Sequence, residues 1–242
     1  MPDGAGRGGE RVSGLQILAQ LRVSMTRDDI ARHLADYGAL TGYDTPLRRL
    51  RESTGGRVDL HLEAHRLAII DWLRAWRCRH LRRTDTGRTA EGLREWFNTW
   101  GRRLPDDQVT LLELSEAQLI QAGDAFDALR RTPAAHRSLR GGEADVAFGD
   151  SAAAKTMFAV WPQAFVSWDA PIRAAFGWPG RGAGYLKLLR LSAETLEGLA
   201  RRFAVPVGEL PAFLGRPASP PPKLVDEYLW IRVRKERWTA GL

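Results

Sequence analysis

The sequence predicts an all-α fold, and three observations lead to this prediction. Apolar residues recur at helical spacing in successive segments, and glycine or proline separates these segments. No segment shows period-2 alternation rich in Val, Ile and Thr, so no sheet is expected. Hydrophobic residues make up 44% of the 242 residues and charged residues 27%, a composition typical of a globular protein with a sizeable core.

The first half of the chain is expected to hold a tail followed by five helices. Residues 1–13 are polar and rich in glycine, so they are expected to form a disordered tail. Thr26 has the side chain of a helix N-cap, and Gly42 and Pro46 interrupt the periodic pattern that follows it. The predicted helices of this half cover residues 15–23, 26–37, 59–83, 89–101 and 115–131.

The second half is expected to hold shorter helices and a stiff linker. Pro171 stands early in one predicted helix, where proline is tolerated, and Ser192 is expected to cap another. Residues 180–184 indicate a flexible turn, and the Pro-rich residues 218–222 indicate a stiff linker. The predicted helices of this half cover residues 151–160, 170–176, 192–203, 209–214 and 224–238.

Basic residues are concentrated in one stretch of the chain. The net charge is +7, and residues 66–103 hold ten Arg against four acidic residues, a local charge of +6. This concentration favours a polyanionic partner such as nucleic acid. The alternative is that the high arginine content reflects the composition of the genome.

Cysteine usage and hydropathy exclude several classes of protein. Cys78 is the only cysteine in the sequence, so neither an intramolecular disulfide nor a Cys-based metal site can form. No apolar run approaches the ~18 residues that a membrane-spanning helix needs, and no signal peptide is evident. A cytoplasmic protein with no membrane partner is therefore expected.

Residues 148–177, FGDSAAAKTMFAVWPQAFVSWDAPIRAAFG, carry the most information about function. A turn of small residues leads into a predicted helix with Lys155, and a loop rich in aromatic residues leads to Asp169 at the next predicted helix start. This segment resembles the helix-hairpin-helix DNA glycosylases of the HhH-GPD superfamily. Lys155-Thr156-Met157 stands at their Lys-Thr step, Trp168-Asp169-Ala170-Pro171-Ile172 at their aspartate step, and Phe148-Gly149-Asp150-Ser151 replaces their Leu-Pro-Gly-Val-Gly hairpin.

The resemblance implies a DNA glycosylase with two helical lobes flanking a cleft, and with Asp169 near the cleft. The chain would form one helical domain over 14–242, with possible lobes of about 14–140 and 141–242. It would hydrolyse the N-glycosidic bond of a damaged or modified base in double-stranded DNA, in repair or in defence against modified phage DNA. No cofactor, no metal and no obligatory protein partner are implied.

The same resemblance implies roles for particular residues. Asp169 would stabilise the oxocarbenium ion and activate water, and Lys155 would contact a phosphate or act as an amine nucleophile. A flipped base needs aromatic walls, and phosphates need cations. The residues expected in these two roles are Trp161, Phe165, Trp168 and Trp178 for the base pocket, and Arg74, Arg77, Arg82, Arg83 and Arg173 for the phosphates.

Other patterns leave alternatives open. Residues 192–214 resemble a helix-turn-helix, but the second helix is apolar and acidic at Glu209, which favours a packing role. His61 and His65 share one helix face, as metal ligands do, but no third ligand is evident. A non-enzymatic DNA-binding protein, either a decayed glycosylase or a helix-turn-helix regulator, and a helical interaction module are therefore alternative functions.

Overall fold

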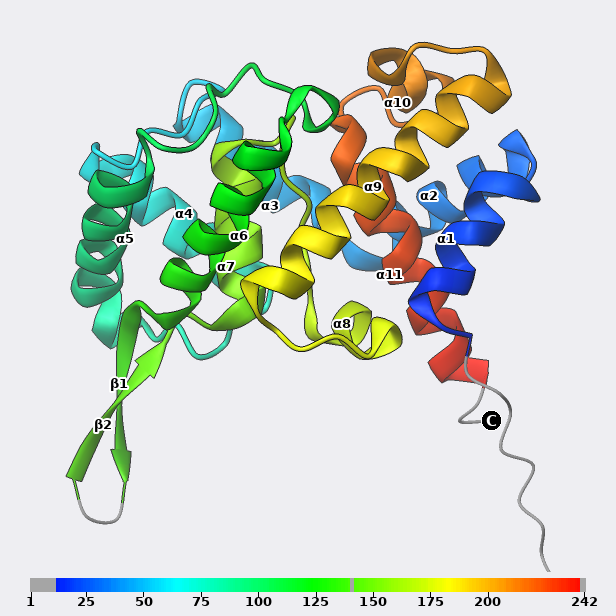
Figure 1. Ribbon diagram of the computed structural model, residues 1–242. Helices are drawn as coiled ribbons and strands as arrows, with labels where there is room; N and C mark the ends of the chain where they lie inside the picture. The colour runs from blue at the N-terminus through cyan, green and yellow to red at the C-terminus, as the bar shows by residue number, and fades with distance from the viewer. Residues whose placement is uncertain (1–11, 140–141, 240–242) are drawn as a thin grey trace, which may run out of the picture.

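The structure is a computed structural model, and it describes residues 12–139 and 142–239. The described residues are mostly helical, as the apolar periodicity predicts (Figure 1). The predicted tail lies outside the described residues except for Val12 and Ser13, and the Ser13 side chain caps the first helix. The helices of the first half are α1 (Gly14–Val23), α2 (Arg27–Thr41), α3 (Asp44–Ser53), α4 (Glu63–Ala75), α5 (Thr86–Trp100) and α6 (Glu116–Arg131).

An antiparallel hairpin separates these helices from those of the second half. Its strands are β1 (Pro133–Leu139) and β2 (Gly142–Ala147), and it projects from the helical body in Figure 1. Strand β2 leads directly into α7, so the hairpin and the start of α7 form one continuous segment. The helices that follow are α7 (Gly149–Val160), α8 (Ala170–Phe176), α9 (Gly182–Phe203), α10 (Leu210–Phe213) and α11 (Pro221–Thr239).

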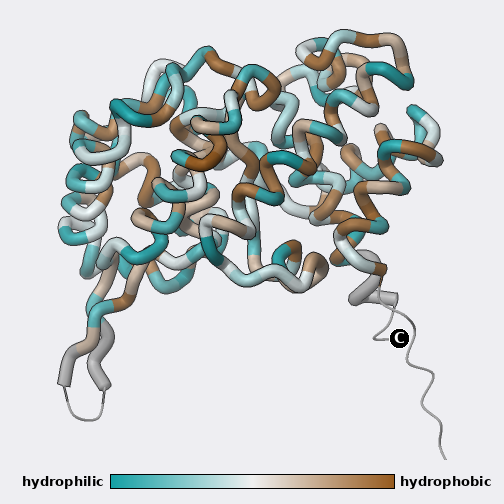
Figure 2. The backbone as a smooth tube through the Cα atoms, in the orientation of Figure 1, coloured by the Kyte–Doolittle hydropathy of each residue, from teal (hydrophilic) through white to brown (hydrophobic). Residues whose placement is uncertain are grey.

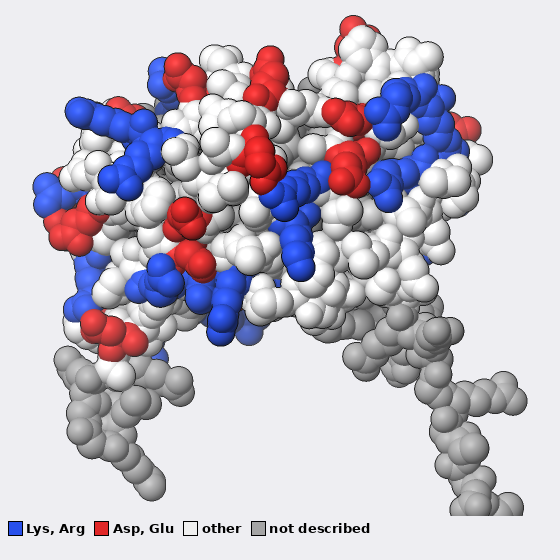
Figure 3. Space-filling model, viewed as in Figure 1, with Lys and Arg blue, Asp and Glu red and all other residues white. Residues whose placement is uncertain are grey.

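Helices α7 and α11 form the centre of the core. Residues 152–160 of α7 are all buried, and α11 buries a long series of its own residues. Helix α7 packs against α4 and α6, whereas α11 packs against α2, α8 and α9. Helix α5, at the edge of the molecule, has more hydrophilic residues than α7 (Figure 2). On the face shown in Figure 3, basic and acidic side chains are interspersed, so this face has no large patch of one sign.

The hairpin corrects the expectation that the chain forms no sheet. Residues 133–147 contain a single β-branched residue, Val146, so their sequence gives almost no strand signal. Tertiary contacts hold the hairpin instead. Arg88 pairs with Asp145 at 2.7 Å, and the Thr89 hydroxyl donates to the Ala134 carbonyl at 2.6 Å.

The helix predicted over 59–83 is also shorter than expected, because the chain reverses after Ala75. Arg77 adopts a φ of +65°, a left-handed conformation that non-glycine residues rarely take. The Cys78 N–H then bonds back to the Leu73 carbonyl at 2.9 Å. Arg74 holds the loop that follows by donating to the carbonyls of Leu81 and Arg82.

The second half departs from the sequence prediction at α9 and α11. Ser192 is not a cap but a buried residue inside α9, which begins ten residues earlier at Gly182. Gly182 lies so close to Gly123 of α6 that a Cβ at Gly182 would stand 2.3 Å from the Gly123 carbonyl oxygen. The 180–184 segment is therefore partly a helix–helix contact, and Pro221 of the predicted linker starts α11.

Candidate functional site

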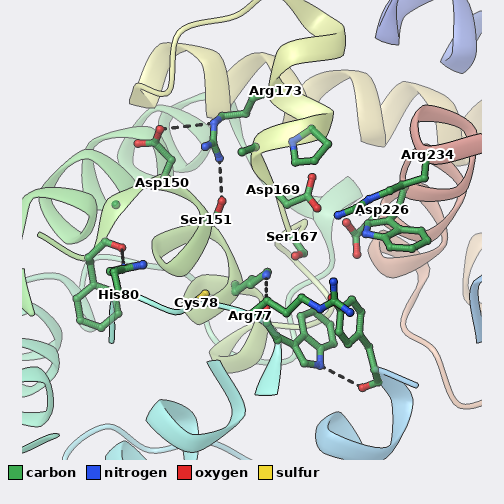
Figure 4. A pocket seen from close by; sticks show the side chains of 18 of the residues that line it. Arg77, Cys78, His80, Asp150, Ser151, Ser167, Asp169, Arg173, Asp226 and Arg234 are labelled. Atoms are coloured by element: carbon green, nitrogen blue, oxygen red, sulfur yellow. Dashed lines mark hydrogen bonds and ion pairs between the residues drawn. The ribbon is translucent and has the colours of Figure 1, made fainter. Parts of the chain in front are cut away.

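A cavity of about 330 Å³ lies where several elements meet (Figure 4). It is lined by the turn after α4, the N-terminal turns of α7 and α8, and one face of α11. Tyr37 of α2 and Tyr43, which precedes α3, complete its wall. Its volume falls at the lower end of the range that small-molecule pockets occupy, roughly 300–1,000 Å³.

Lys155 lines this cavity from α7, whose residues around it are all buried. The residue is 9% exposed, and its ammonium donates to the Trp76 carbonyl at 2.7 Å. Trp76 is the C-cap residue of α4, where carbonyl groups lack helical partners and cations are favoured. The bond therefore fixes Lys155 and satisfies the end of α4 at the same time.

Asp169 lines the same cavity as the N-cap of α8, as the sequence predicts. Its Oδ1 accepts a hydrogen bond from the Ile172 N–H at 3.1 Å, and Pro171 follows in the first turn. The residue is half-buried. Figure 4 shows its carboxylate pointing into the cavity, so the cap bond fixes the direction of the carboxylate toward any molecule bound there.

Asp226 is a further carboxyl group in the cavity, and no motif in the sequence marks it. It lies on α11, is 5% exposed, and points into the same space as Asp169 (Figure 4). Burial raises the pKa of Asp226 to about 7, and the nearby charge of Asp169 acts in the same direction. Three carboxyl groups thus line the cavity in different surroundings: Asp150 is paired with Arg173, Asp169 is half-exposed and caps α8, and Asp226 is buried.

Next to Asp226 lies a buried cluster of paired charges. Glu227 is fully buried and is bonded to Lys223 at 2.7 Å and to Arg216 at 2.8 Å. Arg216 also bonds to Asp44 at 2.7 Å, which ties α11 to the start of α3. Each charge in this cluster has an opposite charge, so the cluster fixes α11 in position behind the cavity.

Aromatic side chains form one wall of the cavity. Tyr43 lies 5.3 Å from Trp76 between ring centroids, and the Trp76 indole N–H donates to the Tyr43 carbonyl at 3.1 Å. Trp230 of α11 stands edge-on to Tyr37 at 5.5 Å and to Tyr43 at 6.4 Å. Such a wall can stack against a planar ring.

Arginine side chains also border the cavity. Arg77 is exposed at the left-handed turn after α4. Arg173 bonds to Ser151 and to the Trp168 carbonyl at 3.2 Å, and it pairs with Asp150 at 3.5 Å. Arg234 lies 4.9 Å above the Trp230 ring, and Figure 4 shows it pointing toward Asp169 and Asp226. These cations would attract an anionic ligand to the cavity.

The structure separates the arginines that were expected to bind phosphates. Arg77 and Arg173 line the cavity. Arg82 and Arg83 do not line it; they are exposed and follow Arg77 by five and six residues in the chain. Arg74 has a different role from the expected one, because it donates to two backbone carbonyls and to the Thr86 hydroxyl and pairs with Asp71. Its guanidinium stabilises a loop.

The four aromatic residues expected to form the base pocket do not line this cavity. Trp161 is buried against Phe165 and against Trp96 of α5, and Trp168 is buried against Phe126. Trp178 stacks on Phe176 at 4.4 Å. Their density in the sequence reflects core packing, and the wall is made by aromatic residues from distant segments.

The sequence offered a weak signal for the residues that were missed. Lys223, Glu227, Trp230 and Arg234 recur at intervals of three or four along α11, with Asp226 beside them. Charged residues at such spacing, on a helix that also carries many apolar residues, indicate a buried polar site.

The alternative metal site at His61 and His65 is not assembled. His65 accepts a hydrogen bond from the Asp59 N–H at 3.0 Å, and His61 packs edge-on against Phe97. Among the described residues, no group of three or more His, Cys, Asp or Glu side chains is placed to hold a metal ion.

Comparison of the chain with family models, with curated proteins and with solved structures finds no match. None of the described helices is long and apolar enough to cross a membrane.

Proposed function

We propose that the protein is a DNA glycosylase that hydrolyses the N-glycosidic bond of a modified or damaged base. One observation carries the proposal. Lys155 and Asp169, the two residues that the resemblance to helix-hairpin-helix glycosylases marks, line a single cavity with an aromatic wall and a basic surround. Their positions in the sequence did not require the two side chains to line the same cavity, because a loop separates α7, which holds Lys155, from Asp169 at the start of α8.

In this proposal Asp169 stabilises positive charge on the sugar. Breaking the glycosidic bond builds oxocarbenium character at C1′, which a fixed carboxylate stabilises. One oxygen of Asp169 is engaged by the α8 cap, so the other is available to face the sugar or to accept a proton from water. The cap bond keeps this orientation without rearrangement during the reaction.

Lys155 acts as a fixed positive charge in this proposal. Its ammonium is bonded to the Trp76 carbonyl, so an attack on C1′ would require it to leave that bond and to lose a proton. The contact therefore favours simple hydrolysis over an amine-linked intermediate. The expected product is an abasic site without strand cleavage.

The aromatic wall and the arginines provide the binding contacts. A base that leaves the DNA stack can pack against Tyr43, Trp76 and Trp230. Arg77 is exposed and lines the cavity, and exposed Arg82 and Arg83 follow it in the chain; in this proposal the three arginines contact phosphates on either side of the flipped nucleotide.

An abasic-site assay tests this proposal. Duplex DNA carrying uracil, alkylated, oxidised, hydroxymethylated or glucosylated bases is incubated with the wild-type protein and with Asp169→Asn. Asparagine is also a good N-cap, so this variant should fold while losing base release by at least about 10²-fold. Asp124→Asn, at an exposed position on α6, is the matched control and should behave as the wild type.

The assay also distinguishes the alternatives. Strand breaks without alkali would assign Lys155 the amine role. No released base on any substrate, together with salt-dependent binding to DNA, would contradict the glycosylase and favour a non-enzymatic DNA-binding protein.

A further inference from the structure

Asp226 is a buried carboxyl group that differs sharply from its neighbour Glu227. Both lie on α11, and both are almost completely inaccessible to solvent. Glu227 is bonded to Arg216 and Lys223, whereas no group among the described residues forms a hydrogen bond or ion pair with the Asp226 carboxyl. Asp226 instead borders the cavity that holds Asp169.

Two of the nearby cations, Lys223 and Lys155, are bonded to other groups. Lys223 is bonded to Glu227, and Lys155 is bonded to the Trp76 carbonyl, each at 2.7 Å. Arg77 and Arg234 border the cavity without an ion pair to Asp226. The titratable groups that act on Asp226 or respond to it are Tyr37 of α2, Lys155 of α7, Asp169 at the start of α8, Tyr185 of α9, and Lys223 and Glu227 of α11.

These surroundings favour the protonated form of Asp226. A buried carboxylate without hydrogen-bond donors is costly, so such a group takes up a proton. The pKa of Asp226 is raised to about 7 by burial, with Asp169 adding to the effect. Below about pH 7 Asp226 therefore mostly holds a proton, and it lies in the same cavity as Asp169, the N-cap of α8, an arrangement that resembles the acid and base pairs of catalytic sites.

We propose that Asp226 is the general acid of the reaction, a catalytic residue that protonates the base as it leaves. This inference rests on the proposed function. The bond between C1′ and the base nitrogen breaks, and its electron pair moves into the base. Asp226 gives its proton to the base, which leaves as a neutral molecule. Water forms the new bond to C1′ and transfers a proton to Asp169, and exchange with solvent then restores both carboxyl groups.

The test compares two leaving groups. One duplex carries a neutral base that the wild-type protein releases in the abasic-site assay, and the other carries 7-methylguanine, which is already cationic and leaves without an added proton. Asp226→Asn should lower kcat on the neutral base by about 10²–10⁴-fold and on 7-methylguanine by less than about tenfold. Asp169→Asn should lower both, and Asp124→Asn neither.

Each other outcome has a defined meaning. Equal losses on the two bases, or no loss on either, would overturn the general-acid role of Asp226. A wild-type protein that releases 7-methylguanine but no neutral base would also overturn it, since no base would then need the proton. A wild-type protein that releases no base at all would instead refute the proposed function.

A second measurement does not depend on substrate. The ¹³Cγ NMR signal of Asp226 in the whole protein, assigned by its absence in Asp226→Asn, should titrate near pH 7. A titration below about pH 5, in the range of ordinary aspartates, would overturn the inference even if the protein is an active glycosylase.

Discussion

Replacing Asp226 with asparagine should stabilise the protein at alkaline pH and change its stability little at acidic pH. The pKa of Asp226 is raised from 3.8 to about 7 in the folded protein. Between these two values the native state binds more protons than the unfolded chain, so the free energy of unfolding falls as pH rises through this window. Since each pKa unit corresponds to about 1.4 kcal/mol, the ionised carboxylate lowers stability by up to about 4 kcal/mol above pH 7.

Asparagine has nearly the same shape and no charge, so it removes this penalty. Urea unfolding of the wild type and of Asp226→Asn should give similar free energies near about pH 4, and the variant should be more stable by several kcal/mol near about pH 8.5. Asp124→Asn, the exposed control, should follow the wild type at both values. A difference between wild type and Asp226→Asn that stays constant from acidic to alkaline pH would refute the reasoning.

Three further predictions concern residues that line the cavity or hold its helices in position. Arg77→Gly should raise the free energy of unfolding by up to about 1 kcal/mol, because glycine adopts the left-handed φ of +65° without strain. The same variant should bind DNA more weakly, and unchanged binding would contradict the proposed phosphate contact. Arg216→Met should lower the free energy of unfolding, measured in urea, by about 3 kcal/mol, because it removes the ion pairs with Asp44 and with buried Glu227. A decrease below about 1 kcal/mol would show that Lys223 alone is a sufficient partner for Glu227. Asp169→Ala should lower stability by about 1 kcal/mol and Asp169→Asn by much less, since alanine cannot cap α8, and equal losses in the two variants would argue against the cap.

Local signals in the sequence predicted much of the helical framework. Thr26 and Asp169 each stand at a predicted helix start, and their side chains accept backbone hydrogen bonds there, as the Ser115 side chain also does at the start of α6. These hydrogen bonds join residues only three positions apart, so the local sequence is sufficient to predict them. The position of Asp169 at the start of α8 was therefore predictable from the sequence alone.

Features that depend on distant contacts were not predictable in this way. The turn at Arg77 requires a left-handed backbone conformation, but the sequence has no glycine at this position to indicate it. The hairpin is held by contacts with Arg88 and Thr89 of α5. The cavity wall combines Tyr43 and Trp76 with Trp230, which are far apart in the chain. The sequence pattern instead pointed to the aromatic residues nearest to Asp169 in the chain, of which Trp161, Phe165 and Trp168 are buried in the core and Trp178 is partly buried.

The place of α11 in the chain has a consequence for the order in which the site is completed during synthesis. Domains begin to fold from the N-terminal side while the ribosome still adds residues, at about 5–20 residues per second. Lys155 and Asp169 emerge well before Asp226, Trp230 and Arg234, which supply one whole side of the cavity. A nascent chain therefore has both marked residues but no enclosed site until the segment through residue 234 has left the ribosome and packed against α2, α8 and α9.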